Sequence, residues 1–297
     1  PGTVPVVGAR ARAGGRPGRV MIAAPTRNEP DALDSFLVVI FLAGIYLEFA
    51  PHITASIPVP AAPAGVAGLT LLLRRRQWID ERQLFVLLGV IGLYLASTLC
   101  VADNVYLKER LKGFLQISYS LVIGYGLFIA LQRYERPRLA RLFLGFSLFI
   151  VIGCALENYT GFRAVSDAVR THLFQKYLYD SGLRDEALYG GIRPKLFSSE
   201  PSYVAYALTL YAFAWYVLST WRWKTMGYFA ILGAGLFLIR SPTVVLGGAL
   251  MVPYEILLAG RSIFGRTVGM DVKLTKIIVL SIVVVAVVGI GAARFFS

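Results

Sequence analysis

Nine runs of apolar residues divide this chain, and they constrain its fold more than any other feature. A helix crosses a bilayer core with about 20 mostly apolar residues. The runs lie at residues 35–50, 57–73, 84–101, 113–131, 142–157, 203–220, 226–239, 242–259 and 277–293. They lack the alternation of a barrel strand, and lipid cannot satisfy an unpaired backbone, so each run is predicted to be a helix. The sequence predicts an all-α, polytopic transmembrane bundle of about nine segments.

Composition supports a membrane protein, since 57% of the residues are hydrophobic and 16% are charged. A soluble domain of this size does not need such an apolar excess for its core. The segment 57–73 leaves two alternatives open, because Pro58, Pro60 and Pro63 interrupt its first turns. It either crosses the membrane or forms a re-entrant, half-buried segment.

The positions of Lys and Arg predict the orientation of the bundle. Cations are concentrated in the N-terminal tail and in the alternate loops 74–82, 132–141, 221–224 and 260–276. The positive-inside rule places all of these in the cytoplasm, with the N-terminus. The net charge of +13 follows from this bias, so it indicates contact with anionic membrane lipids and no nucleic-acid partner. Cations on the opposite face depart from the rule: Lys108, Arg110, Lys112, Arg163, Arg193 and Lys195.

This orientation divides the chain into four parts. Residues 1–34 are predicted to be a disordered, basic cytoplasmic tail, and residues 35–157 hold segments one to five. Residues 158–202 form a long extracytoplasmic loop, and residues 203–297 hold segments six to nine. Cys100 and Cys154 lie near outer helix ends, where they serve as packing residues or, in an oxidising compartment, as a disulfide.

The long loop is the natural place for a site, since long loops in compact proteins are commonly functional. Between residues 162 and 177, apolar residues recur at helical spacing, which predicts an amphipathic helix at the membrane interface. It serves either as a cap over the bundle or as a lid over a substrate. His172 is expected to be an ordinary residue of this helix.

The sequence RPKLFSSEPS at residues 193–202 follows, and it allows two interpretations. Ser199, Glu200 and Pro201 are typical of a helix start, with Pro suited to the first turn. Alternatively, Arg193, with Lys195 and Arg184, binds a phosphate or pyrophosphate through its cationic side chain. Glu200 would then be a general base at the mouth of an apolar cavity, with partial desolvation raising its pKa.

The loop arginine, RPKLFSSEPS opening a helix, and the later LIRSPTVVLGG hairpin resemble the O-antigen polymerase and ligase superfamily of bacterial membranes. The resemblance covers roughly residues 80–297. It implies a glycosyltransferase of the bacterial inner membrane that needs neither metal nor cofactor. Its donor would be a polyprenyl-pyrophosphate-linked glycan and its acceptor a second glycan, with polysaccharide export or chain-length proteins as further partners.

The resemblance also assigns roles to particular residues. Arg193 would bind the donor pyrophosphate, and Glu200 would activate the acceptor hydroxyl. Substrate-binding roles would fall to Arg184, Lys195, Ser202, Arg240 and Ser241. Without the resemblance, Arg240 is equally explained as an interfacial arginine whose side chain reaches towards water.

Two other functional classes stay open. A non-catalytic or truncated membrane component of polysaccharide assembly has the same topology but does not depend on Glu200. A lipid-linked glycan transporter predicts repeats and polar groups at the midplane of the membrane. Glu48 and Glu157 are expected to be solvated at outer helix ends, whereas Glu255 is expected to face the bundle or a watery cavity.

Overall fold

The computed structural model describes residues 31–54, 57–100, 106–174 and 182–263. Within these ranges the chain forms ten α-helices, one short 3-10 helix and one small strand pair. The α-helices are α1 Ala32–Leu47, α2 Ala62–Arg74, α3 Glu81–Leu99, α4 Leu107–Leu131, α5 Arg136–Tyr159, α6 Phe162–Phe174, α7 Gly182–Tyr189, α8 Pro201–Leu218, α9 Lys224–Ile239 and α10 Pro242–Ile263. Strands β1 (His52–Thr54) and β2 (Ile57–Pro58) pair antiparallel, and η1 spans Arg76–Trp78.

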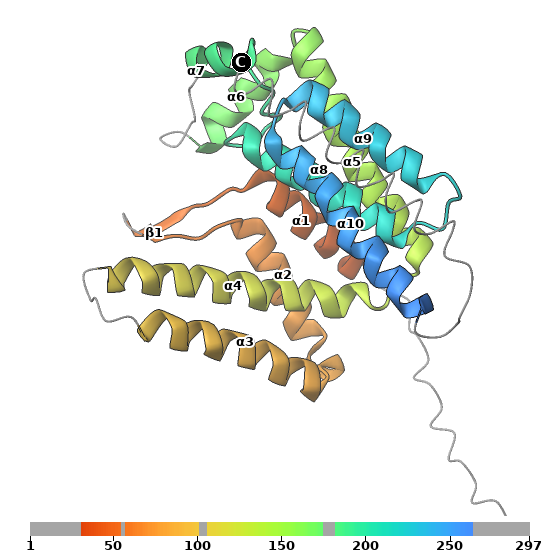
Figure 1. The fold of residues 1–297 in the computed structure, drawn as a ribbon. Coiled ribbons are helices and arrows are strands. Elements are labelled where there is room, and N and C mark those ends of the chain that lie inside the picture. Colours follow the sequence, from red (N-terminus) through yellow and green to blue (C-terminus); the bar gives the residue numbers. More distant parts are fainter. Residues whose placement is uncertain (1–30, 55–56, 101–105, 175–181, 264–297) are drawn as a thin grey trace, which may run out of the picture.

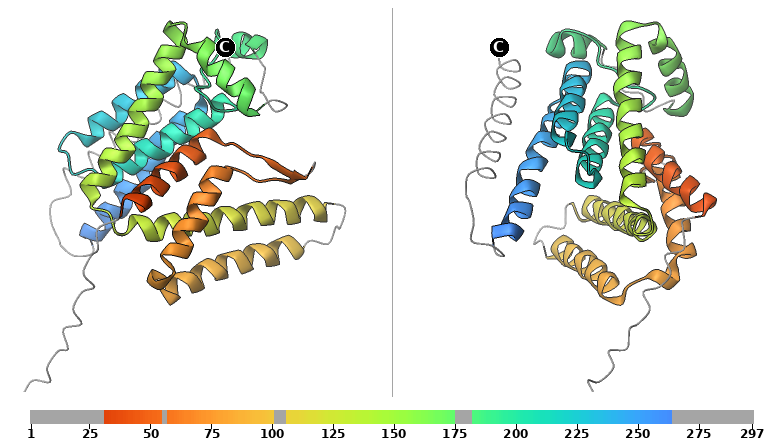
Figure 2. Two further views of the ribbon diagram at one scale, coloured as in Figure 1. Left: turned by 180° about the vertical axis from the view of Figure 1, so that it is seen from behind. Right: turned by 90° about the vertical axis from the view of Figure 1, so that its right-hand side faces the viewer.

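Helix α8 lies at the centre of the larger group of helices and contacts α1, α5, α9 and α10. Helix α2 connects this group to the rest of the molecule, because it packs on both α1 and α4. Helices α3 and α4 form a hairpin that crosses below the other helices and does not run parallel to them (Figure 1). Figure 2 shows the short helices α6 and α7 gathered at one end of α5 and α9.

Local sequence explains where the helices begin. The Asp31 carboxylate accepts the N–H of Asp34 at 2.7 Å, and the Asp80 carboxylate accepts the N–H of Arg82 at 2.8 Å, so both act as N-caps. Proline stands in the first turn of α2, α5 and α8, where its missing N–H costs nothing.

Small residues allow the closest helix contacts. A Cβ placed on Gly44 of α1 would lie 2.4 Å from the backbone N of Ala64 in α2. A Cβ on Gly126 of α4 would lie 2.2 Å from the carbonyl oxygen of Gly68 in α2. Glycine is therefore required where α2 meets its two neighbours, a mode of packing common between helices in membranes.

Each predicted apolar segment within the described ranges overlaps a helix, and the segment 277–293 lies outside them. Three helices, α3, α4 and α5, are long and apolar enough to cross a membrane, which indicates a membrane protein. Helices α1, α2 and α9 are also apolar but shorter. Among the described residues, only these three helices meet the requirements of length and apolar composition together, so the prediction of nine crossings is not confirmed.

The prediction for residues 57–73 was wrong in its first five residues, because 57–58 form strand β2 and the helix begins at Ala62. Proline at 58 and 60 explains the delay, since it cannot supply the helical N–H. With 13 residues, α2 rises about 20 Å, less than the roughly 30 Å of a bilayer core. This length favours the half-buried alternative over a full crossing.

Helix α1 begins three residues earlier than predicted, so residues 32–34 belong to the bundle and not to the tail. Asp34 is 1% exposed and forms ion pairs with Arg74 and Arg75. Residues 1–30 lie outside the described residues. Cys154 is buried and Cys100 is exposed, and both are free thiols, so the disulfide alternative does not apply.

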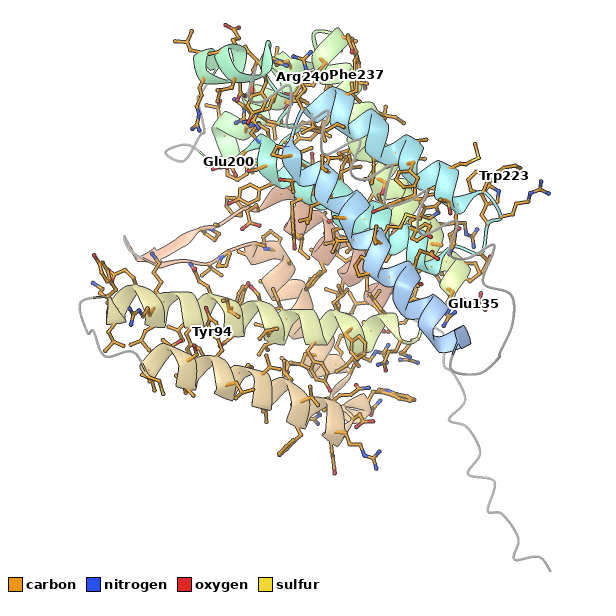
Figure 3. The ribbon with its side chains drawn as sticks, viewed as in Figure 1. Tyr94, Glu135, Glu200, Trp223, Phe237 and Arg240 are labelled. Carbon is orange, nitrogen blue, oxygen red and sulfur yellow. The ribbon has the colours of Figure 1, made fainter. Side chains whose placement is uncertain are left out.

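The labelled side chains of Figure 3 mark two ends of the larger helix group. Glu200 and Arg240 lie at the end that carries α6 and α7, and Glu135 and Trp223 lie at the opposite end. We call the first the loop end and the second the basic end, because it carries Arg133, Arg136, Arg138 and Arg222.

Candidate functional site

The centre of the loop end is a tight turn that surrounds the carboxylate of Glu157. The backbone N–H groups of Lys195 and Leu196 donate to its two oxygens at 3.1 and 2.6 Å. Leu196 and Phe197 have φ values of +34° and +66°, so successive N–H groups converge as in an anion-binding nest. The expectation that Glu157 is solvated was wrong, since it is 3% exposed.

The strained turn is anchored from three sides. Left-handed backbone at a non-glycine residue costs roughly 1–2 kcal/mol, and the hydrogen bonds to Glu157 offset this cost. The Leu196 side chain is fully buried against Gly153 of α5, where a Cβ would come within 2.5 Å of Cδ2 of Leu196. The Tyr46 hydroxyl of α1 donates to the Leu196 carbonyl.

Arg170 of α6 fixes the next two residues. Its Nε donates to the Ser198 carbonyl at 2.7 Å and its Nη2 to the Ser199 carbonyl at 3.1 Å. The guanidinium is 2% exposed, and its Nη1 pairs with Asp167 at 2.5 Å. Ser166, one turn earlier on the same face, accepts the N–H of Phe197 at 3.1 Å. The polar face of α6 therefore holds the turn in place.

The apolar face of α6 points away from the protein. Val165 is 53% exposed and Val169 is 38% exposed, whereas Ser166, Arg170 and Phe174 are buried. A helix with exposed valines and a buried arginine is suited to a membrane interface, where lipid covers the apolar side. His172 is also exposed, as expected for an ordinary residue of this helix.

Glu200 occupies the N-cap position of α8, and the predicted helix start at Pro201 is confirmed. Its side chain makes no capping bond to the helix backbone, unlike those of Asp31 and Asp80. Instead, one carboxylate oxygen accepts the hydroxyl of Ser202 at 2.9 Å, and Glu200 is half-buried. The Glu200 carboxylate is therefore available to a substrate, although the backbone of the preceding turn is tightly held.

Arg193 is held by Asp185 of α7. Its Nε and Nη2 lie 3.0 and 2.9 Å from Oδ1 of Asp185, and its Cζ lies 4.1 Å above the Tyr189 ring. The arginine side chain is 10% exposed and the aspartate 1%. Oδ2 of Asp185 is buried without a hydrogen-bond partner among the described residues. The positive charge of Arg193 is thus balanced by the Asp185 carboxylate.

The other predicted residues are two arginines, on or next to α7, and two residues that are largely buried. Arg240 lies beside this pair, since its Nη1 donates to the Tyr189 carbonyl at 2.6 Å, and Arg184 is exposed on α7. Lys195 and Ser241 are 8% and 2% exposed. Ser241 precedes α10, and its hydroxyl oxygen accepts the N–H of Thr243 with an N···O distance of 3.4 Å. Lys195 also contributes through its backbone at the turn.

An open apolar groove of about 490 Å³ runs between α1 and α5. Tyr46 of α1, Phe149 of α5 and Phe197 of the turn line it towards the loop end, and Arg141 of α5 lines it nearer the basic end. Phe197 is three residues from Glu200 and packs edge-on against Phe162 of α6, with ring centroids 5.7 Å apart. The groove can therefore accept a hydrocarbon chain whose head lies near the turn.

Sequence reasoning missed three residues that organise this site: Glu157, Arg170 and Asp185. Each is nearly fully buried and charged, a combination that in a membrane protein marks a structural or functional role. The spacing of Ser166 and Arg170 by four positions was the one available sign, since it places both on one helix face. Within the described ranges, no group of His, Cys, Asp or Glu could hold a metal ion.

Comparison of the chain with protein-family models, curated proteins and solved structures gave no match. The geometry of the loop end is thus the basis for a functional assignment.

Proposed function

We propose that this protein is a membrane-embedded glycosyltransferase that polymerises or ligates polyprenyl-pyrophosphate-linked glycans, as in the synthesis of O-antigen or exopolysaccharide. The carrying observation is the carboxylate of Glu200, which stands at a helix start without capping the helix. A carboxylate that caps a helix is already hydrogen-bonded to backbone N–H groups. Among the described residues, the Glu200 carboxylate accepts a hydrogen bond only from the Ser202 hydroxyl. The resemblance of residues 193–202 to the superfamily supports the same role.

In the proposed reaction, Glu200 accepts the proton of the acceptor sugar hydroxyl. The hydroxyl oxygen then bonds to the anomeric carbon of the donor, and the bond from that carbon to the phosphate oxygen breaks. The electron pair leaves with the polyprenyl pyrophosphate. Ser202, hydrogen-bonded to Glu200, orients the carboxylate or the acceptor.

Cationic groups at the loop end would stabilise the leaving group, where negative charge accumulates. Arg240, whose Nη1 donates to the Tyr189 carbonyl, and the exposed Arg184 of α7 would take this role. Arg193 would take part by exchanging the Oδ1 atom of Asp185 for a phosphate oxygen. The groove beside Phe197 would hold part of the isoprenoid chain. The protein would lie in the bacterial inner membrane, with its N-terminus in the cytoplasm and its loop end outside.

One observation favours a second candidate, a non-catalytic membrane component of polysaccharide assembly. The buried Asp185 pairs with the Arg193 guanidinium, which also stacks on Tyr189. These contacts are expected if Arg193 stabilises the loop and does not bind a substrate. In that case the loop end would bind glycan or a partner without chemistry at Glu200.

A glycan polymerisation assay separates the two. A host that lacks its own polymerase and supplies lipid-linked repeat units would express wild type, Glu200→Gln or Glu186→Gln at matched membrane levels. Glu186 is an exposed carboxylate on neighbouring α7 and is the matched control. Loss of the glycan ladder in Glu200→Gln alone supports catalysis. A ladder that persists in Glu200→Gln contradicts it and favours the second candidate.

A further inference from the structure

A second cluster of arginines lies at the basic end, on the opposite side of the molecule from Glu200. Here the end of α2, η1 and the connection between α4 and α5 come together (Figures 1 and 2). The Arg133 guanidinium of that connection lies over the Trp78 ring of η1, with Cζ 5.3 Å from the ring centroid. Arg133 is 9% exposed, so the contact is made largely out of solvent.

Three arginines and two aspartates come together in this cluster. Arg74 pairs with Asp31 at 2.7 Å and with Asp34 at 3.4 Å, and Arg75 pairs with Asp34. Arg133 adds a further guanidinium beside Arg75. Burial, and then the charge of Arg133, lower the pKa of Arg75. Two guanidinium groups that repel each other in a partly dry environment are stabilised when an anion joins them.

Two hydrogen-bond donors in the cluster have no acceptor. The Nε of Arg75 and the indole Nε1 of Trp78 are buried and have no hydrogen-bond partner among the described residues. A buried donor without a partner costs roughly 1–3 kcal/mol, so a fold retains such groups where a ligand completes them. Both groups only donate, and an acceptor with several oxygens and a negative charge matches them.

We propose that Arg75, Trp78 and Arg133 form a binding site for a phosphate-bearing anion at the basic end. A guanidinium Nε and an indole N–H together suit the oxygens of a phosphate, and the arginines supply the balancing charge. The phosphate belongs either to the headgroup of an anionic membrane lipid or to a free phosphate compound. Basic pockets between helices at the inner membrane surface recognise lipid headgroups in this way, with tryptophan at the level of the headgroups. The site is independent of the function proposed for Glu200.

Arg222 and Trp223 supply a matched control. Their cation–π contact has a similar geometry, with Cζ 4.8 Å from the ring, and it lies at the same end of the molecule. Both side chains are exposed, so water satisfies their donors. Trp78→Phe removes the indole N–H and keeps a ring below Arg133, and Trp223→Phe makes the same change where no site is proposed. Arg75→Lys keeps the charge of Arg75 and removes its Nε, with Arg222→Lys as its control.

Binding is measured on the purified full chain in neutral detergent at one fixed salt concentration. Dioctanoyl phosphatidylglycerol, dioctanoyl phosphatidylcholine and inorganic phosphate are titrated separately, and the increase in thermal unfolding temperature gives each affinity. We expect phosphatidylglycerol to bind wild type at least tenfold more tightly than phosphatidylcholine. Trp78→Phe and Arg75→Lys should each weaken that binding by roughly fivefold to tenfold, while both control variants keep wild-type affinity.

The phosphate titration distinguishes the two sources. Binding of inorganic phosphate that is weakened by Trp78→Phe supports the site and assigns it to a free phosphate compound. A dependence on Trp78 seen with phosphatidylglycerol alone supports the site and assigns it to a lipid headgroup. If Trp78→Phe and Arg75→Lys bind both probes as wild type does, or if the control variants lose as much affinity, the proposal is overturned.

Discussion

The carboxylate of Glu157 on α5 accepts the backbone N–H of Leu196 at 2.6 Å, across 39 positions of sequence. A second bond, from the N–H of Lys195, completes a pair that fixes the loop end to the bundle. Because the turn lies three residues before Glu200, this buried carboxylate sets the position of the proposed general base without contacting it.

Glu157→Gln should loosen the turn. The amide keeps one acceptor oxygen but places an NH₂ group against a backbone N–H, so one donor remains buried and unsatisfied. We expect a loss of about 1–3 kcal/mol in the free energy of unfolding and faster hydrogen exchange at Lys195 and Leu196. Glu135→Gln, an exposed carboxylate at the basic end, is the control. Equal exchange rates in both variants would contradict the proposed anchor.

Glu200→Ala should leave stability nearly unchanged, because the Glu200 side chain makes no capping bond. Asp80→Ala, in contrast, removes a real N-cap from α3 and should cost about 1 kcal/mol. Denaturant unfolding of both variants in the same detergent compares the two. A cost for Glu200→Ala as large as for Asp80→Ala would show that Glu200 serves the fold, and would weaken its assignment as a general base.

Arg170→Lys should destabilise the turn although it preserves charge. A single ammonium cannot reproduce the fork that reaches the carbonyls of Ser198 and Ser199 and the carboxylate of Asp167. We expect about 2 kcal/mol of destabilisation and cleavage of the loop by added protease. Arg184→Lys, at an exposed position on α7, should change neither quantity. Protection of the loop in Arg170→Lys would argue against this role.

Asp185 and Arg193 should be strongly coupled in stability. Each single change, Asp185→Asn or Arg193→Gln, leaves a buried charge without its partner and should cost about 3 kcal/mol. The double variant should cost clearly less than the sum, since neither charge remains. Denaturant unfolding of the four proteins completes the cycle. Additive costs would mean that the pair contributes no direct interaction.

Much of the helical architecture was predictable because apolar runs of sufficient length require paired backbone groups. The start of α8 was predictable from Ser199, Glu200 and Pro201, and the inward direction of Glu255 is confirmed by its hydrogen bond with Tyr216 of α8. Such features depend on local sequence or on a single charge within an apolar run.

The turn around Glu157 was not predictable, because it depends on residues far apart in sequence. Nothing local marks Leu196 and Phe197 for left-handed backbone, a conformation that is favourable only when Glu157, Ser166 and Arg170 surround it. The pairing of Arg193 with Asp185 was missed for a related reason. A sequence shows that a cation is present but not which carboxylate the fold brings to it.

The exposure of α3 has a consequence for the behaviour of the whole protein. Among its described side chains, Thr98 alone is buried, while Phe85 and Leu93 are 78% and 75% exposed. Protein contacts therefore contribute little to holding this helix, and its 19 residues extend about 28 Å. Its tilt should follow the thickness of the surrounding lipid, since mismatch in length is relieved by tilting. The tilt of α3 and of its partner α4 should therefore differ between short-chain and long-chain bilayers, while the structure of the loop end should stay the same.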